Sequence, residues 1–101
     1  MNTNGLFGDK NFTSFCVSAT MDPGVMPRVM EVFAKESLIP SRWTSFVENN
    51  NLMIDIQMDG LLPARAEYFA RVIRKIPMVE NVLSSTKASP PDRHGILSTN
   101  Q

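Results

Sequence analysis

The sequence predicts an α+β domain in which a four-stranded antiparallel sheet carries two helices on one face. Two segments, residues 11–19 and 52–58, alternate apolar and polar side chains as half-buried strands do. Two other segments repeat apolar residues at helical spacing, and runs of Pro, Gly and Asn separate the elements. Together with two further strand-like segments, these give the element order β-α-β-β-α-β.

The first strand is predicted at residues 11–19. Its inward side carries Thr13, Phe15, Val17 and Ala19. A turn-forming run at residues 20–24 leads into the first helix. The apolar stripe of this helix consists of Val25, Val29, Val32 and Phe33, broadened by Met26 and Met30. Pro27 lacks an amide hydrogen, which is harmless only in the first turn, so the helix should begin near Gly24 or Val25.

A hairpin is predicted to follow, with strands at residues 40–48 and 52–58. The asparagines at residues 49–51 supply its turn, since Asn tolerates positive φ better than most residues. The second strand of the hairpin has an apolar inner face formed by Leu52, Ile54, Ile56 and Met58.

A second helix is predicted with Pro63 in its first turn and Pro77 after its end. Its apolar stripe consists of Leu62, Ala66, Phe69, Val72, Ile73 and Ile76. Residues 79–86 are predicted to form the last strand. Right-handed crossovers and the central hairpin then favour a ferredoxin-like βαββαβ sandwich. In this arrangement the first and third strands lie in the middle of the sheet, and the second and fourth are its edges.

The predicted elements occupy residues 11–86, which we expect to form one domain. Residues 1–10 are rich in Asn and Gly, and residues 87–101 are rich in Pro, Ser and Asn. Such segments have little apolar surface to bury, so we expect a flexible leader and a flexible tail. The chain has no apolar run typical of a signal peptide or a membrane span, so we expect a cytoplasmic protein with no membrane partner.

Charge and residue chemistry argue against several classes of function. Ten Lys and Arg residues balance ten Asp and Glu residues, whereas binding to nucleic acid needs a positive surplus. The single cysteine, Cys16, allows no internal disulfide and no cysteine metal site, and we expect no metal or other cofactor. Asp55 has no second carboxylate at a useful spacing, and the only histidine, His94, lies in the predicted tail. We therefore expect no catalytic residues and no enzymatic activity.

The segment at residues 21–40 carries a more specific pattern. Its turn has the sequence Asp22-Pro23-Gly24-Val25, and its helix continues as Arg28-Val29-Met30-Glu31-Val32-Phe33-Ala34. This pattern resembles the turn and first helix of the ACT domain, a regulatory module, and the resemblance extends over about residues 12–86. In length and spacing the chain is most similar to the small regulatory subunits of acetohydroxyacid synthase, an enzyme of branched-chain amino-acid biosynthesis.

The resemblance implies a ligand site at the start of the first helix. In the family, an amino acid lies between this turn and the start of the second strand of a neighbouring subunit. The corresponding residues here are Met21, Asp22, Gly24, Val25, Met26, Ile39 and Pro40. Free backbone amides at Gly24, Val25 and Met26 would attract the carboxylate of such a ligand, and Gly24 would let it approach closely.

Two of these positions differ from the pattern of amino-acid-binding members, which often carry an amide or carboxylate in the turn and an Asn at the second strand. Here Met21 and Ile39 are apolar, which leaves Asp22 as the nearby polar group for the ammonium ion of a ligand. The alternative is that Pro23 and Gly24 only shape the turn.

The second strand is predicted to lie at a sheet edge, which can pair with the same edge of a second copy. The interface of such a homodimer would contain Ser41, Arg42, Trp43, Thr44 and Phe46. Trp43 and Phe46 fall on opposite faces, so at most one belongs to the core, and the alternative is that both pack within one subunit. The sheet face without helices offers a second possible contact surface, formed by Phe12, Cys16, Met53 and one of these aromatics.

Two hypotheses about function follow from these observations. In the first, the chain is a regulatory subunit that docks onto the catalytic chain of a biosynthetic enzyme and shifts its conformational equilibrium. In the second, it is a stand-alone homodimeric module that binds a small metabolite, such as an amino acid, or scaffolds another protein.

Overall fold

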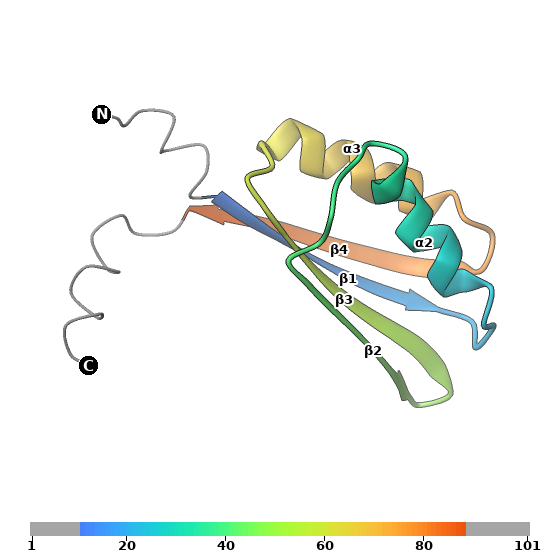
Figure 1. Ribbon diagram of the computed structural model, residues 1–101. Coiled ribbons are helices and arrows are strands. Elements are labelled where there is room, and N and C mark those ends of the chain that lie inside the picture. Colours follow the sequence, from blue (N-terminus) through green and yellow to red (C-terminus); the bar gives the residue numbers. More distant parts are fainter. Residues whose placement is uncertain (1–10, 89–101) are drawn as a thin grey trace, which may run out of the picture.

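Six elements make up residues 11–88, the part of the chain that the computed structural model describes. They are β1 (Asn11–Ala19), α2 (Val25–Ala34), β2 (Arg42–Glu48), β3 (Asn51–Asp59), α3 (Pro63–Arg74) and β4 (Val79–Ala88). The strands form one antiparallel sheet in the order β2-β3-β1-β4, and both helices lie on the same face of it (Figure 1). The predicted fold class and the central position of β1 and β3 are confirmed.

Several element boundaries differ from the predicted ones, and β3 spans Asn51–Asp59 instead of residues 52–58. β2 starts at Arg42 instead of residue 40, and the Ser41 amide just before it donates to the Gln57 carbonyl at 2.8 Å. β4 continues to Ala88 instead of ending at residue 86, because its last residues pair with the first residues of β1. The predicted leader at residues 1–10, and the predicted tail from residue 89 onward, lie outside the described residues.

The predicted hairpin is confirmed, with a turn of two residues. Asn49 and Asn50 have φ angles of 53° and 64°. Positive φ at both central positions is the type I′ geometry, whose twist matches that of the strands it joins. The pair that closes the turn is Glu48 and Asn51, so the third asparagine already belongs to β3.

The core lies between the sheet and the two helices. The predicted inner faces of β1 and β3 are buried, including Thr13 at the start of β1. The Phe33 ring lies 5.6 Å from the Phe15 ring and 5.2 Å from the Phe69 ring, measured between centroids. Three aromatic side chains therefore join β1, α2 and α3 at the centre of the domain.

The helices begin where their prolines require, but their buried faces differ in part from the predicted stripes. Buried residues are Val25, Val29 and Phe33 on α2, and Ala66, Phe69, Ala70 and Ile73 on α3. Ala70 was absent from the predicted stripe. The prediction for Leu62 is wrong: it is 57% exposed, because it is the extended residue that precedes α3. Met30, which was expected to broaden the first stripe, is 46% exposed.

The helices leave the inner face of β2 uncovered, and Figure 1 shows this strand lying beyond both of them. On that face Trp43 is partly buried against the core, Ser45 is exposed, and Val47 is 59% exposed. β2 is therefore accessible both along its free edge and on the sheet face that carries the helices.

Candidate functional site

The turn before α2 uses the side chain of Asp22 to satisfy its own backbone. The Gly24 amide donates to Asp22 Oδ1 at 2.8 Å, and the Val25 amide donates to the Asp22 carbonyl at 3.0 Å. The expectation that both amides are free for a ligand is wrong. The Asp22 carboxylate instead lies at the positive end of the helix, where the carboxylate of an amino acid was expected. An aspartate that accepts from the amide two residues later forms an Asx-turn, a local contact that shapes the chain entering α2.

Gly24 has a different role from the one expected. Its φ is −73°, which any residue can adopt. A Cβ atom at this position would lie 3.2 Å from Asp22 Oδ1, closer than such atoms usually come. Because Gly24 has no side chain, the Asp22 carboxylate can bond its amide. The space that we expected a ligand to occupy is thus taken by a side chain of the same chain.

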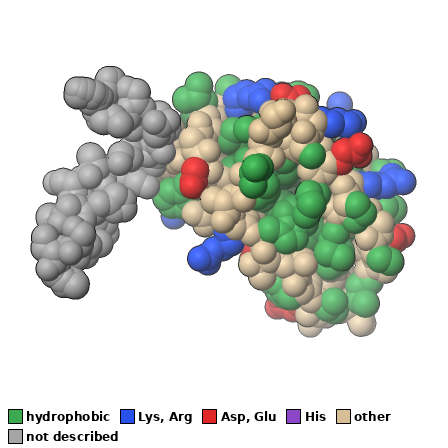
Figure 2. Space-filling view, viewed as in Figure 1, with side chains coloured by type: hydrophobic (Ala, Val, Ile, Leu, Met, Phe, Trp, Pro, Cys, Tyr) green, Lys and Arg blue, Asp and Glu red, His purple; other side chains and the backbone are tan. Residues whose placement is uncertain are grey.

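An apolar hollow of about 190 Å³ lies beside this turn. It is lined by Met21, Asp22, Pro23, Met26, Val47 and Leu52. Figure 2 shows hydrophobic side chains gathered between α2 and the hairpin end of β2 and β3. Asp22 supplies the only charged group of the lining, so the hollow suits a small apolar group better than a zwitterion. Of the predicted ligand-binding residues, Met21, Asp22 and Met26 meet here.

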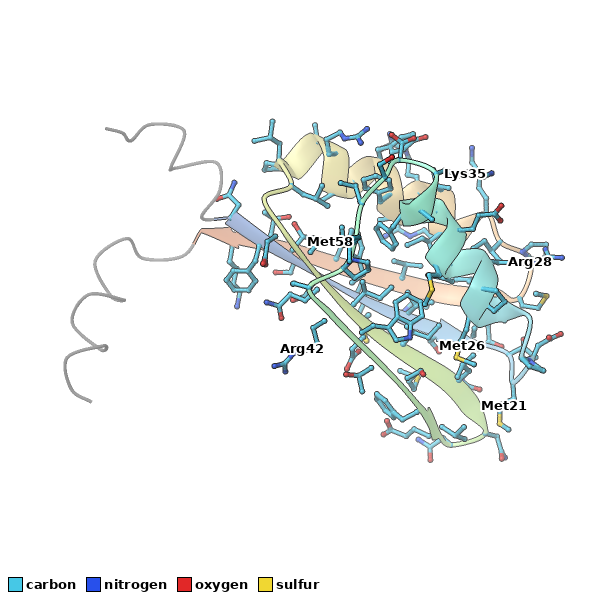
Figure 3. The ribbon with its side chains drawn as sticks, in the orientation of Figure 1. Met21, Met26, Arg28, Lys35, Arg42 and Met58 are labelled. Atoms are coloured by element: carbon cyan, nitrogen blue, oxygen red, sulfur yellow. The ribbon has the colours of Figure 1, made fainter. Side chains whose placement is uncertain are left out.

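Ile39 and Pro40, the other predicted ligand-binding residues, do not reach this hollow within one chain. Figure 3 shows Met21 and Met26 at one end of the sheet and Arg42, at the start of β2, toward the other end. Ile39 precedes Arg42 and is 87% exposed. A site that combines the turn with the start of β2 therefore needs a second chain, as the family resemblance implies.

Three residues of the hollow were not predicted, namely Pro23, Val47 and Leu52. Val47 and Leu52 lie opposite each other in the hairpin, on the face that the helices cover elsewhere. The signal for Val47 was present, because it is an apolar residue at an inward position of a strand predicted to lie at an edge. To place Val47 in the hollow, one would also have to know that α2 does not cover β2.

The predicted dimer residues lie along β2 and just before it. Trp43 packs against the core, whereas Phe46 lies on the opposite face, beside Met53, and is 39% exposed. The prediction that at most one of these aromatics belongs to the core is confirmed. Ser41 Oγ donates to Gln57 O at 3.0 Å and so holds the start of β2 against β3. Arg42 and Thr44 are exposed on the open face.

The open face of the sheet has a second, more polar hollow of about 480 Å³. Its floor includes Ser14, Cys16, Asp55 and Gln57, with Arg42 and Leu83 at its sides. The predicted apolar patch is divided by these polar groups, although Leu83, which is 62% exposed, adds to it. Burial, and next the neighbouring Asp55 carboxylate, raise the pKa of the Cys16 thiol above its ordinary value. Cys16 is therefore a neutral thiol near neutral pH and a poor nucleophile.

Residues 11–88 contain no group of three or more His, Cys, Asp and Glu side chains placed to hold a metal ion. Within the same range, neither helix has the length and apolar character needed to cross a membrane.

The fold and the hollow define a small α+β domain with an open strand edge next to a helix start. The model of the ACT-like domain family matches residues 9–89, and the chain belongs to this family. ACT domains are generally regulatory, non-catalytic modules that usually bind amino acids. None of the curated proteins compared with the chain matches it.

Several solved structures have a similar fold. The crystal structure of the ACT domain from GTP pyrophosphokinase of Chlorobium tepidum superimposes with a TM-score of 0.64 at 9% identity, over 73% of this chain and 96% of that one. The solution structure of the same domain gives a TM-score of 0.64 at 9% identity, over 75% and 88%. The C-terminal domain of the MgtC protein from Mycobacterium tuberculosis gives 0.61 at 14% identity, over 79% and 90%. At these identities the likeness concerns the fold alone.

Proposed function

We propose that the chain is a regulatory module of amino-acid metabolism that forms a homodimer through β2 and docks onto a biosynthetic enzyme such as acetohydroxyacid synthase. The observation that carries this proposal is the free edge of β2. Six of its seven residues are exposed, and its pairing with β3 is regular from end to end. An uninterrupted edge of this kind is a template for a further strand.

The backbone groups available at this edge follow from the hairpin. A two-residue turn is flanked by a hydrogen-bonded pair, here Glu48 and Asn51. Residues that bond to the neighbouring strand alternate with residues that face away from it. Trp43, Ser45 and Val47 therefore direct their amide and carbonyl groups toward a second chain.

A two-fold axis through Ser45 gives a register in which all of these groups are used. Trp43 then lies opposite the partner's Val47, and Ser45 lies opposite its own copy. In the same register Arg42 lies opposite the partner's Glu48, so that each end of the strand carries an attractive pair. Such an isologous contact closes at two chains. It also covers part of Val47 and Phe46, which are 59% and 39% exposed in one chain.

This pairing would also complete the site beside α2. Because the two strands run antiparallel, the start of β2 in one chain lies beside the end of β2 in the other. The partner's Ile39 and Pro40 would thus approach the hollow that contains Val47 and Met21. The residues that the family resemblance assigns to one ligand site then come from two chains.

Exchanging the charges at the two ends of β2 tests the proposed dimer. Arg42→Glu or Glu48→Arg alone places like charges opposite each other at both ends, and each should weaken the dimer about tenfold. The double variant Arg42→Glu/Glu48→Arg restores the attractive pairs and should restore the affinity. Sedimentation equilibrium measures the dissociation constants.

Arg28→Glu on α2 is the matched control, since it makes the same charge change on the helix layer, away from β2 (Figure 3). It should leave the dissociation constant unchanged. A wild-type chain that stays monomeric at all concentrations, or a double variant as weak as the single ones, would contradict the proposal.

A second candidate function, a sensor of a small apolar amino acid, is favoured by the apolar hollow. Valine, leucine or isoleucine at 100 times its dissociation constant should add about 2.7 kcal/mol of stability, which shifts the melting temperature by several degrees. Met21→Trp fills the hollow and should abolish that shift, and serine should produce none. Absence of a shift with all three apolar amino acids would reject the sensor and leave docking to an enzyme as the function.

A further inference from the structure

The second edge of the sheet, formed by β4, is occupied by a side chain. Arg74 is the last residue of α3, and its Nη2 atom donates to the carbonyl oxygen of Val82 at 2.9 Å. The bond links residues on different elements, and it is partly buried although the arginine itself is exposed. It therefore holds the guanidinium group on the backbone of an edge strand.

The pairing pattern shows that this carbonyl faces away from the sheet. The Gly60 amide donates to the Asn11 carbonyl at 2.8 Å, so Asn11 bonds toward β3. Bonding directions alternate along β1, so Val17, an even number of residues later, also bonds toward β3. Val82 lies opposite Val17, and β1 therefore does not use its carbonyl. Arg74 covers a group that an additional strand would have to bond.

The rest of this edge is also poorly suited to pairing. Its register with β1 shifts between Ser18 and Ala19, which marks a bulge near Glu80. Farther along, Pro63 and Glu67 of α3 line a hollow together with Ser84 and Thr86 of β4. A charged side chain, a bulge and an overhanging helix are the features by which edge strands avoid association. Within the described residues, β2 differs from β4, because its pairing with β3 is regular.

We propose that Arg74 guards β4, so that copies of this chain associate through β2 alone and assembly stops at two chains. The inference rests on the proposed pairing through β2. Pairing of β2 with β4 would be heterologous and would continue from chain to chain as an open ribbon. Pairing of β4 with β4, added to the β2 contact, would have the same consequence. If Arg74 prevents β4 from pairing, neither of these open assemblies can form.

Removing the guanidinium group tests the guard. Arg74→Ala should produce species larger than a dimer, at protein concentrations about tenfold lower than any at which the wild-type chain forms them. Arg71→Ala is the matched control: it removes the same charge one turn earlier on α3 and should behave like the wild-type chain. Light scattering coupled to size-exclusion chromatography measures the masses, and circular dichroism verifies the fold. If Arg74→Ala does not fold, Arg74→Met removes the same donors while keeping a good helix former.

The outcomes separate this inference from the proposed dimer. A monomeric wild-type chain together with a self-associating Arg74 variant would reject the β2 dimer and keep the guard. Arg42→Glu/Arg74→Ala, in which the β2 contact is weakened, should form dimers through β4. A folded Arg74 variant with the mass of the wild-type chain and of Arg71→Ala at every concentration would overturn the guard, whatever the state of β2.

Discussion

Replacing Phe33 by alanine is expected to destabilise the fold by about 3–5 kcal/mol. Phe33 is fully buried on α2, with one neighbouring ring on β1 and another on α3. Alanine would leave a cavity where three elements meet, and two helices and a sheet cannot all close onto it without separating from one another. Domains of this size have a total free energy of unfolding of only about 5–15 kcal/mol, so the variant should lose a large share of its stability.

Urea unfolding followed by circular dichroism measures this effect. The matched control is Phe46→Ala, the same substitution on the open face of β2, where the side chain is 39% exposed. It should cost less than about 1 kcal/mol. Equal losses for the two variants would contradict the view that the ring cluster around Phe33 is the centre of the core.

The fold was predictable because its elements carry strong local signals. In β3, the even positions are all apolar, whereas the odd positions are polar except for Met53, and only one register buries the even side. The two helix starts are fixed by Pro27 and Pro63, whose rings are compatible with the first turn only. Each of these signals acts within a few residues, so it can be recognised without knowledge of the rest of the chain.

The parts that were predicted incorrectly depend on contacts between elements. Ala70 is small enough to be ignored in an apolar stripe, yet it lies on the buried side of α3 together with Ala66 and Ile73. Leu62 continues the helical spacing but precedes the first helical residue, so its side chain points elsewhere. Helical periodicity predicts which face of a helix is buried, but it does not predict where the helix begins or ends.

The turn before α2 was predictable in position, but its hydrogen bonding was not. The Asp22-Pro23-Gly24 run located the turn correctly. It did not reveal that the aspartate folds back onto the Gly24 amide, because that contact depends on the backbone geometry of the turn. Met21 and Met26 were correctly placed beside the helix start, whereas Val47 required the hairpin to be positioned against α2. A residue contributed by another element cannot be found from the turn alone.

A hydrogen-bonded pair of threonine hydroxyls, on the first and the last strand, gives the second large expected effect on stability. Thr13 Oγ1 and Thr86 Oγ1 lie 2.8 Å apart and join β1 to β4, 73 residues later in the chain. Thr13 is fully buried, whereas Thr86 is partly exposed and lines the open hollow beside Pro63 and Glu67. Periodicity predicted that Thr13 points inward, but not that its hydroxyl has a partner on the last strand.

The two single substitutions by valine should therefore have unequal costs. Thr86→Val leaves the buried Thr13 hydroxyl without a partner and should cost about 1–3 kcal/mol. Thr13→Val leaves only the Thr86 hydroxyl, which can turn to water, and should cost less than about 1 kcal/mol. The double variant removes both groups and should be more stable than Thr86→Val, since no polar group then stays buried and unpaired. The urea midpoints of the wild-type chain, the two single variants and the double variant measure these costs. Equal losses of stability in the two single variants would mean that the Thr13 hydroxyl has another partner. A larger loss in Thr86→Val would show that burial of the unpaired hydroxyl, not the bond itself, sets the cost.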